Sequence, residues 1–189
     1  IILNAHVERI SHHENQVQVH SEHAQLAVDA LLIASGRQPA TASLHPENAG
    51  IAVNERGAIV VDKRLHTTAD NIWAMGDVTG GLQFTYISLD DYRIVRDELL
   101  GEGKRSTDDR KNVPYSVFMT PPLSRVGMTE EQARESGADI QVVTLPVAAI
   151  PRARVMNDTR GVLKAIVDNK TQRMLGASLL CVDSHEMIN

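Results

Sequence analysis

The sequence has a single cysteine, Cys181, and only 3% of its 189 residues are aromatic. One cysteine cannot form a disulfide within the chain, and this chain alone cannot supply a redox mechanism that needs two thiols. A low cysteine content also fits a reducing compartment. We therefore expect a cytoplasmic location.

Long apolar runs and clusters of positive charge are missing as well. No stretch reaches the roughly 18 apolar residues that span a bilayer, and the N-terminus lacks the basic-then-apolar layout of a signal peptide. The 19 basic and 24 acidic side chains give a net charge of −5, without a basic run that would attract nucleic acid or anionic lipid. We expect neither a nucleic-acid nor a membrane partner.

The composition is that of a globular protein, with 42% hydrophobic and 23% charged residues. The chain opens directly into a strand-like run at Ile1 and stops abruptly at Asn189, within what reads as the first turn of a helix. We therefore expect a fragment whose two ends are cuts.

The first half of the chain predicts strands followed by one helix. Alternating residues 16–20 indicate a small β-meander, which leads into a buried strand in "LAVDALLIAS" (26–35). Short strands are predicted at 57–62 and 71–77. A helix of about four turns is predicted from Tyr86, because apolar residues recur at helical spacing and two glycines follow them: Leu89, Tyr92, Val95, Leu99, then Gly101 and Gly103.

The second half predicts an antiparallel sheet after a polar linker. "YSVFM", "IQVVTLPV", "GVLKAIVD" and "RMLGASLL" read as strands, and "DNKTQR" as a hairpin loop. Thr129 and Gln132 form a capping box that predicts a helix start, with Gly137 at its end. The predicted class is α/β for the first part and α+β for the second, with domains at 1–36, 37–111 and 112–189.

Gly76 and Asp77 end the predicted strand 71–77, the place where open α/β sheets bind ligands. Sugar-like hydroxyls are suitable partners for this carboxylate, and a glycine lets a ligand approach the backbone. The following helix would present N–H groups and a positive dipole end to the same crevice. A simple turn explains the same two residues without any ligand.

Three motifs resemble the pyridine nucleotide-disulfide oxidoreductases, in that family's order. "TTADNIWAMGDV" resembles the second flavin-binding motif, "LLIASGRQP" the strand leaving the nicotinamide domain, and "VPYSVFMTPPLSRVGMTEEQA" the start of the dimer-interface domain. "QFTYISLDD" is more similar to mercuric reductases than to lipoamide dehydrogenases. The resemblance implies partial FAD- and NAD(P)-binding doubly wound domains followed by an antiparallel interface domain, and a homodimer.

The resemblance also implies roles for single residues. Asp77, beside Gly76, would hold the ribityl hydroxyls of FAD. The run Gln83, Phe84, Thr85 and Tyr86 would line the pyrimidine edge of the flavin. Gly36 would lie against the nicotinamide of NAD(P)H, with Arg37 beside it in the cofactor site. The family passes a hydride from NAD(P)H through FAD to a reactive disulfide, and then to a disulfide, a metal ion or another oxidant.

Several parts of that machinery are absent from this sequence. It has no C-x-x-x-x-C pair, no G-x-G-x-x-G and no C-terminal His-Pro…Glu dyad, since no proline follows His185. We therefore expect this chain to be inactive alone. The terminal electron acceptor and the choice between NADH and NADPH are not readable from it.

Two other classes of function stay open at this point. The chain could be a non-catalytic dimerisation or metal-binding module, although the histidines at 12, 13, 20 and 23 are explained as well by a solvated hairpin. It could also belong to flavin electron carriers that need no thiols. Cys181 reads as a buried and inert thiol, and no catalytic or metal-binding residue is predicted.

Overall fold

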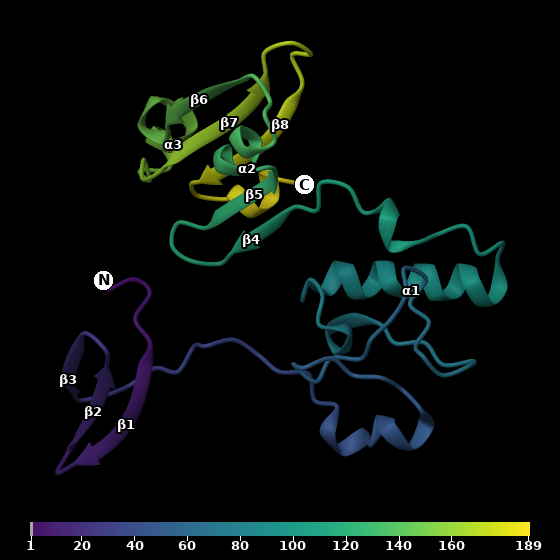
Figure 1. Cartoon of the computed structure of the whole chain (residues 1–189). Coiled ribbons are helices and arrows are strands. Elements are labelled where there is room, and N and C mark those ends of the chain that lie inside the picture. Colours follow the sequence, from purple (N-terminus) through teal and green to yellow (C-terminus); the bar gives the residue numbers. More distant parts are fainter. Residues whose placement is uncertain (1) are drawn as a thin grey trace. The chain divides into compact units, whose positions relative to one another are not determined.

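The computed structural model describes residues 2–189 and divides the chain into two compact units, one ending at Val95 and one running from Arg96 to Asn189. The first unit begins with the antiparallel strands β1 (Val7–His13), β2 (Gln16–Ser21) and β3 (Ala24–Val28), in the order β1-β2-β3 (Figure 1). Val19 of β2 lies opposite Ile10 of β1 and Leu26 of β3. The predicted meander is confirmed.

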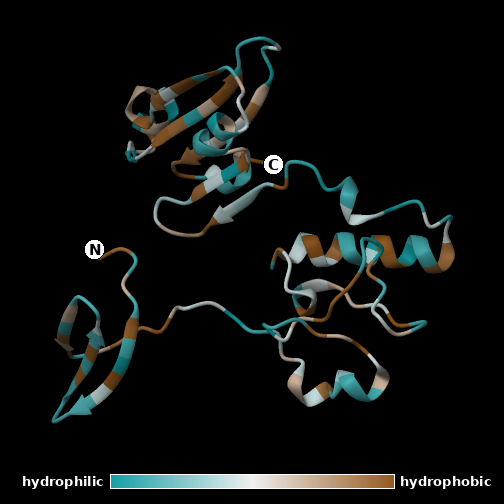
Figure 2. Ribbon diagram, in the orientation of Figure 1, coloured by the Kyte–Doolittle hydropathy of each residue, from teal (hydrophilic) through white to brown (hydrophobic). Residues whose placement is uncertain are grey.

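The apolar segment that follows β3 is not the buried strand that we predicted. Residues 29–39 belong to no strand, and Leu32 and Ile33 are 87% and 73% exposed. Figure 2 shows the hydrophobic colour of this connection next to β3. A buried strand needs neighbours for its backbone N–H and C=O groups, and residues 2–189 supply none here.

The strands predicted at 57–62 and 71–77 are likewise reduced to single bridges. Ile59 pairs with Val53, and Trp73 pairs with His66, while the rest of both segments forms turns and irregular backbone. Short 3-10 helices complete this part: η1 (Ala42–Leu44), η2 (Pro46–Ala49) and η3 (Gly76–Thr79). Small and branched apolar side chains hold the segments together, among them Ala58, Leu65, Ala74 and Ile94.

The helix α1 (Thr85–Leu100) confirms the predicted helix, but its buried face is a different one. The buried residues are Ile87, Asp91 and Ile94, whereas Leu89, Tyr92 and Leu99 are about half exposed. Gly101 ends the helix as expected, and its N–H donates to the carbonyl of Asp97.

The second unit contains a five-stranded antiparallel sheet in the order β4-β5-β8-β7-β6. The predicted strands are β4 (Tyr115–Val117), β6 (Ile140–Pro146), β7 (Val162–Asp168) and β8 (Met174–Leu180). The sequence analysis missed strand β5 (Leu123–Gly127) and helix α3 (Pro151–Val155). The remaining elements are η4 (Thr107–Asp109), α2 (Glu130–Glu135), η5 (Val147–Ala149) and α4 (Ser184–Met187).

The predicted capping box starts α2. The N–H of Gln132 donates to Thr129 Oγ1 at 3.0 Å, and the N–H of Thr129 donates to Gln132 Oε1 at 2.9 Å. Glu130, in the first turn, also forms an ion pair with Lys164 of β7, which ties the helix to the sheet. No helix within residues 2–189 has both the length and the apolar character needed to cross a membrane.

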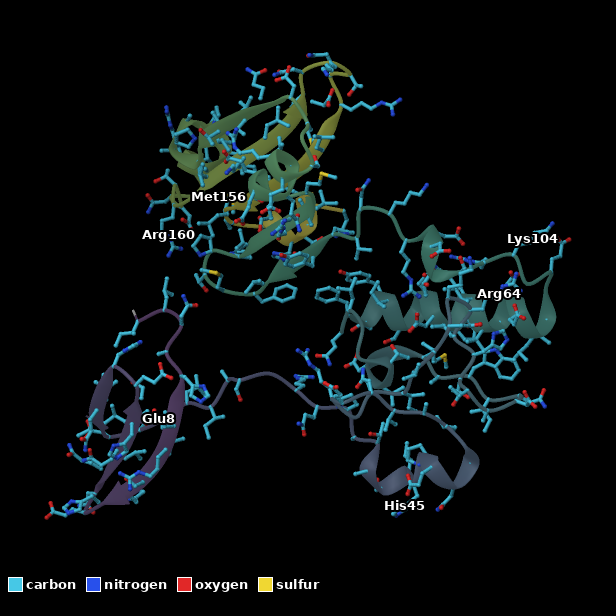
Figure 3. The ribbon with its side chains drawn as sticks, in the orientation of Figure 1. Glu8, His45, Arg64, Lys104, Met156 and Arg160 are labelled. Atoms are coloured by element: carbon cyan, nitrogen blue, oxygen red, sulfur yellow. The ribbon has the colours of Figure 1, made fainter. Side chains whose placement is uncertain are left out.

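An ion pair closes the loop between α3 and β7, where Figure 3 labels Arg160. Both guanidinium contacts are short, with Arg160 Nη2 2.7 Å from Asp158 Oδ2 and Arg160 Nε 2.9 Å from Oδ1. These hydrogen bonds lower the pKa of Asp158 from 3.8 to about 2. A lowered carboxyl pKa means that stability is present above pH 4 and is lost as the pH falls towards 2.

We predict that Asp158→Asn weakens this acid dependence. Unfolding monitored by circular dichroism between pH 2 and pH 5 should show a shallower loss of stability in the variant than in the parent chain. Asp139→Asn, which changes the net charge by the same amount, is the control. Its loss of stability with falling pH should stay closer to that of the parent chain. Identical slopes for Asp158→Asn and the parent would contradict the prediction.

Candidate functional site

The turn that carries the Gly-Asp pair is fixed by backbone hydrogen bonds. Met75 is extended, Gly76 has a φ of +77°, and the 3-10 helix η3 follows. Thr79 Oγ1 donates to the carbonyl of Gly76 at 2.9 Å, and the N–H of Gly80 donates to the carbonyl of Asp77 at 3.0 Å. The turn therefore presents the Asp77 side chain from a defined backbone.

The Asp77 side chain itself is exposed and forms no hydrogen bond or ion pair with residues 2–189. Each carboxylate oxygen can accept hydrogen bonds from outside the chain, and such charge-assisted bonds are stronger than neutral ones. The geometry therefore suits a ligand that offers hydroxyl donors.

Two hollows adjoin this turn within the first unit. A cavity of about 760 Å³ is lined by Gly36, Arg37, Gln83 and Phe84, together with Ser35, Gln38, Pro39, Asn54, Arg56, Ala58, Gly80, Gly81 and Leu82. A smaller hollow of about 360 Å³ is lined by Arg37, Asp77 and Gln83, with Gln38, Pro39, Ala40 and Val78. The two hollows are neighbours, because both are lined by Arg37, Gln38, Pro39 and Gln83.

Gln83 and Phe84, which directly precede α1, line the larger cavity. The carbonyl of Phe84 accepts from the N–H groups of Ile87 and Ser88, and the Phe84 ring stacks on Tyr86 with centroids 5.3 Å apart. Partial desolvation raises the pKa of the Tyr86 phenol above 10, so the hydroxyl keeps its proton at neutral pH. The first N–H groups of any α-helix lack intrahelical acceptors and favour negative charge nearby.

The structure brings together five of the eight predicted site residues. Gly36, Arg37, Asp77, Gln83 and Phe84 line the two hollows. The other three, Gly76, Thr85 and Tyr86, are their neighbours in sequence but do not line either hollow.

Sequence reasoning missed Asn54 and Arg56, which approach the cavity from a loop. It also missed Asp91, whose carboxylate accepts from the N–H of Gly76. Helical spacing places position 91 on the same face of α1 as Ile87 and Ile94. Only this spacing could have indicated from the sequence that Asp91 is buried.

The other residues that we considered form no second site. No group of three or more possible metal ligands occurs among residues 2–189. His20 lies opposite Arg9 in the meander, with Nε2 3.3 Å from Arg9 Nη2. Cys181 is 3% exposed, and burial together with the charge of Asp183 raises the pKa of its thiol, so it is a poor nucleophile.

Family comparisons match nearly the whole chain. The family described as pyridine nucleotide-disulphide oxidoreductase matches residues 1–91, and its dimerisation domain matches residues 113–189. A mercuric reductase of Staphylococcus aureus is 37% identical over 172 residues, which are 91% of this chain and 31% of the relative. The chain therefore spans about a third of the length of that relative.

Solved structures with nearly the same sequence were also found. The HOCl-induced flavoprotein disulfide reductase RclA from Escherichia coli is 99% identical, with a TM-score of 0.91, over 98% of this chain and 43% of that one. A structure described as its Cu(II) complex is also 99% identical, with a TM-score of 0.92, over 98% of this chain and 42% of that one.

We predict that Gly80→Ala disturbs the turn. Gly80 has a φ of +71°, and an added Cβ would lie 2.7 Å from the Cβ of Ala58. The change should lower the free energy of unfolding by about 1–3 kcal/mol, measured by urea denaturation.

Gly81→Ala is the matched control. Gly81 does not have a positive φ, and the nearest atom to an added Cβ, Thr79 Oγ1, is 3.8 Å away. Equal losses of stability in the two variants would contradict the assignment of strain to Gly80.

Proposed function

Because the chain belongs to the pyridine nucleotide-disulphide oxidoreductases, we propose that it forms part of a flavoprotein that passes a hydride from NAD(P)H through FAD to a redox-active disulfide. The observation that carries this proposal is the Asp77 carboxylate, which is exposed on a fixed turn and has no partner within residues 2–189. It stands beside hollows lined by Gly36, Arg37, Gln83 and Phe84.

The residues present fit a flavin with a polyhydroxylated chain. Asp77 accepts hydrogen bonds from ribityl hydroxyls, and Gly76 beside it has no Cβ to obstruct the approach. The run Gln83, Phe84, Thr85 and Tyr86 would border the pyrimidine edge of the ring. Gly36, with Arg37 next to it, would lie at the nicotinamide of NAD(P)H.

The chain's own contribution is to bind, orient and stabilise charge. FAD, when bound, supplies two-electron hydride chemistry. The first N–H groups of α1 and its helix dipole would favour negative charge on a flavin bound beside residues 83–86. The Tyr86 phenol is protonated at neutral pH, and partial burial raises its pKa further. The guanidinium of Arg37 adds a positive charge to both hollows.

The assembly around this site follows from the same proposal. Residues 1–36 form the end of the NAD(P)-binding domain, 37–111 the second half of the FAD domain, and 112–189 part of the interface domain through which the whole protein forms a homodimer. The match to a dimerisation domain supports the homodimer. The cytoplasmic location stays a prediction.

A disulfide, a metal ion or another oxidant is the final electron acceptor. The relatives include mercuric reductases, and one related structure is described as a Cu(II) complex. These names favour a metal ion among the three classes of acceptor. NADH and NADPH stay equal alternatives as the hydride source.

Two other functions have less support. A non-catalytic metal-binding module would need a cluster of ligands, and the part of the chain described here, residues 2–189, contains none. A dimerisation module alone would not need a fixed turn with an exposed carboxylate. A thiol-free electron carrier agrees less well with relatives described as disulfide reductases.

We predict that Asp77→Ala in the full-length protein weakens FAD binding by about 10- to 150-fold. The variant loses a charge-assisted hydrogen bond worth about 1.5–3 kcal/mol. Fluorescence titration of the apoprotein with FAD measures the change. Asp70→Ala removes an exposed carboxylate from the preceding loop and should bind FAD like the parent protein. Unchanged affinity in Asp77→Ala would rule out the ribityl assignment.

We also predict that the 189-residue chain alone purifies without flavin and does not oxidise NADH or NADPH. It has no G-x-G-x-x-G phosphate cradle and no cysteine pair. Absorbance at 450 nm and at 340 nm tests both points, with the full-length protein as control. A yellow preparation of the short chain would show that the flavin site is complete within it.

A further inference from the structure

We propose that Asp91 is the positioning residue of the FAD site, and that it acts by holding Asp77 and the start of α1 in one fixed arrangement. This inference rests on the proposed function, because it assigns the binding of FAD to the turn at Asp77. Asp91 touches the backbone of the turn rather than the ligand.

A buried hydrogen bond carries the argument. The N–H of Gly76 donates to Asp91 Oδ2 at 2.6 Å, and Asp91 is 2% exposed. A buried carboxylate loses its hydration and persists only where hydrogen bonds compensate for that loss. An alanine or leucine at position 91 would fill the inner face of α1 without this cost. The buried carboxyl group therefore indicates a role beyond packing.

The bond joins the backbone of the turn to α1. The carbonyls of Gly76, Asp77 and Val78 are already engaged, by Thr79 Oγ1, the N–H of Gly80 and the N–H of Ile59. The N–H of Gly76 connects the turn to α1, where the Asp91 carboxylate accepts it.

The packing at Gly76 leaves little freedom for another arrangement. A Cβ at Gly76 would lie 3.1 Å from Ser88 Oγ, which shows how closely α1 approaches the turn. Ser88 and Asp91 are one helical turn apart, so one face of α1 meets Gly76 through both a steric and a polar contact.

Asp91 thus links the two parts of the proposed flavin site. Asp77 follows Gly76 directly in the turn, and the residues 83–86 that border the pyrimidine edge lead into the same helix α1. If the bond is lost, the carboxylate of Asp77 and the helix N-terminus can move independently. Part of the binding free energy of the ligand is then spent on aligning them, so the ligand binds more weakly.

A double-mutant cycle in the full-length protein tests the inference. The dissociation constant of FAD is measured by fluorescence titration for the parent, Asp91→Ala, Asp77→Ala and the double variant. We expect Asp91→Ala to weaken binding by about 10-fold in the parent and by less than about 3-fold when Asp77 is already alanine. Asn at position 91 retains an acceptor oxygen, so Asp91→Asn should stay within about 3-fold of the parent. Asp90→Ala, an adjacent change of equal charge, is the control.

The outcomes separate the inference from the proposed function. Additive losses in the cycle, or an Asp91→Asn variant as weak as Asp91→Ala, overturn the role of Asp91 while FAD binding by the parent still stands. A parent protein that binds no FAD overturns the proposed function instead. If Asp91→Ala does not fold by circular dichroism, Asp91→Ser, whose hydroxyl is too short to reach Gly76, replaces it in the cycle.

Discussion

The hydrogen bond from the N–H of Gly76 to the buried carboxylate of Asp91 is the contact on which the candidate site depends. It joins a turn of irregular backbone to the only long helix of the described chain, residues 2–189. Thr79 and Gly80 fix the turn locally, and the N–H of Ile59 donates to the carbonyl of Val78. The buried carboxyl group of Asp91 gives the exposed Asp77 a rigid support, as functional groups require when they must be aligned before a ligand arrives.

Different interactions stabilise the interior of each of the two units. The second unit is a continuous antiparallel sheet with a capped helix, so its backbone groups find partners within the sheet. The part of the first unit that carries the site has only isolated bridges and 3-10 turns, and it relies on small apolar residues such as Ala58 and Ala74. The site therefore lies where local turn chemistry, rather than a sheet, determines the structure.

Local signals predicted the structure well, and signals that depend on distant partners did not. Three predictions depended only on residues close together in the sequence, and all three are confirmed: the capping box at Thr129, the end of α1 at Gly101 and the meander of β1–β3. The apolar segment after Val28 reads as a strand by composition, but strand formation needs a neighbour that residues 2–189 do not supply. Asp91 was missed because its partner is 15 positions away, and an acidic residue in a helix normally faces solvent.

The central claim is that the turn at Asp77 and the start of α1 bind FAD together. Hydrogen exchange of the full-length protein with and without FAD tests it directly, because bound ligand protects the amides that it covers or orders. The account predicts added protection at residues 76–86, with little change in β6–β8. Protection that leaves residues 76–86 unchanged while other segments respond would contradict it.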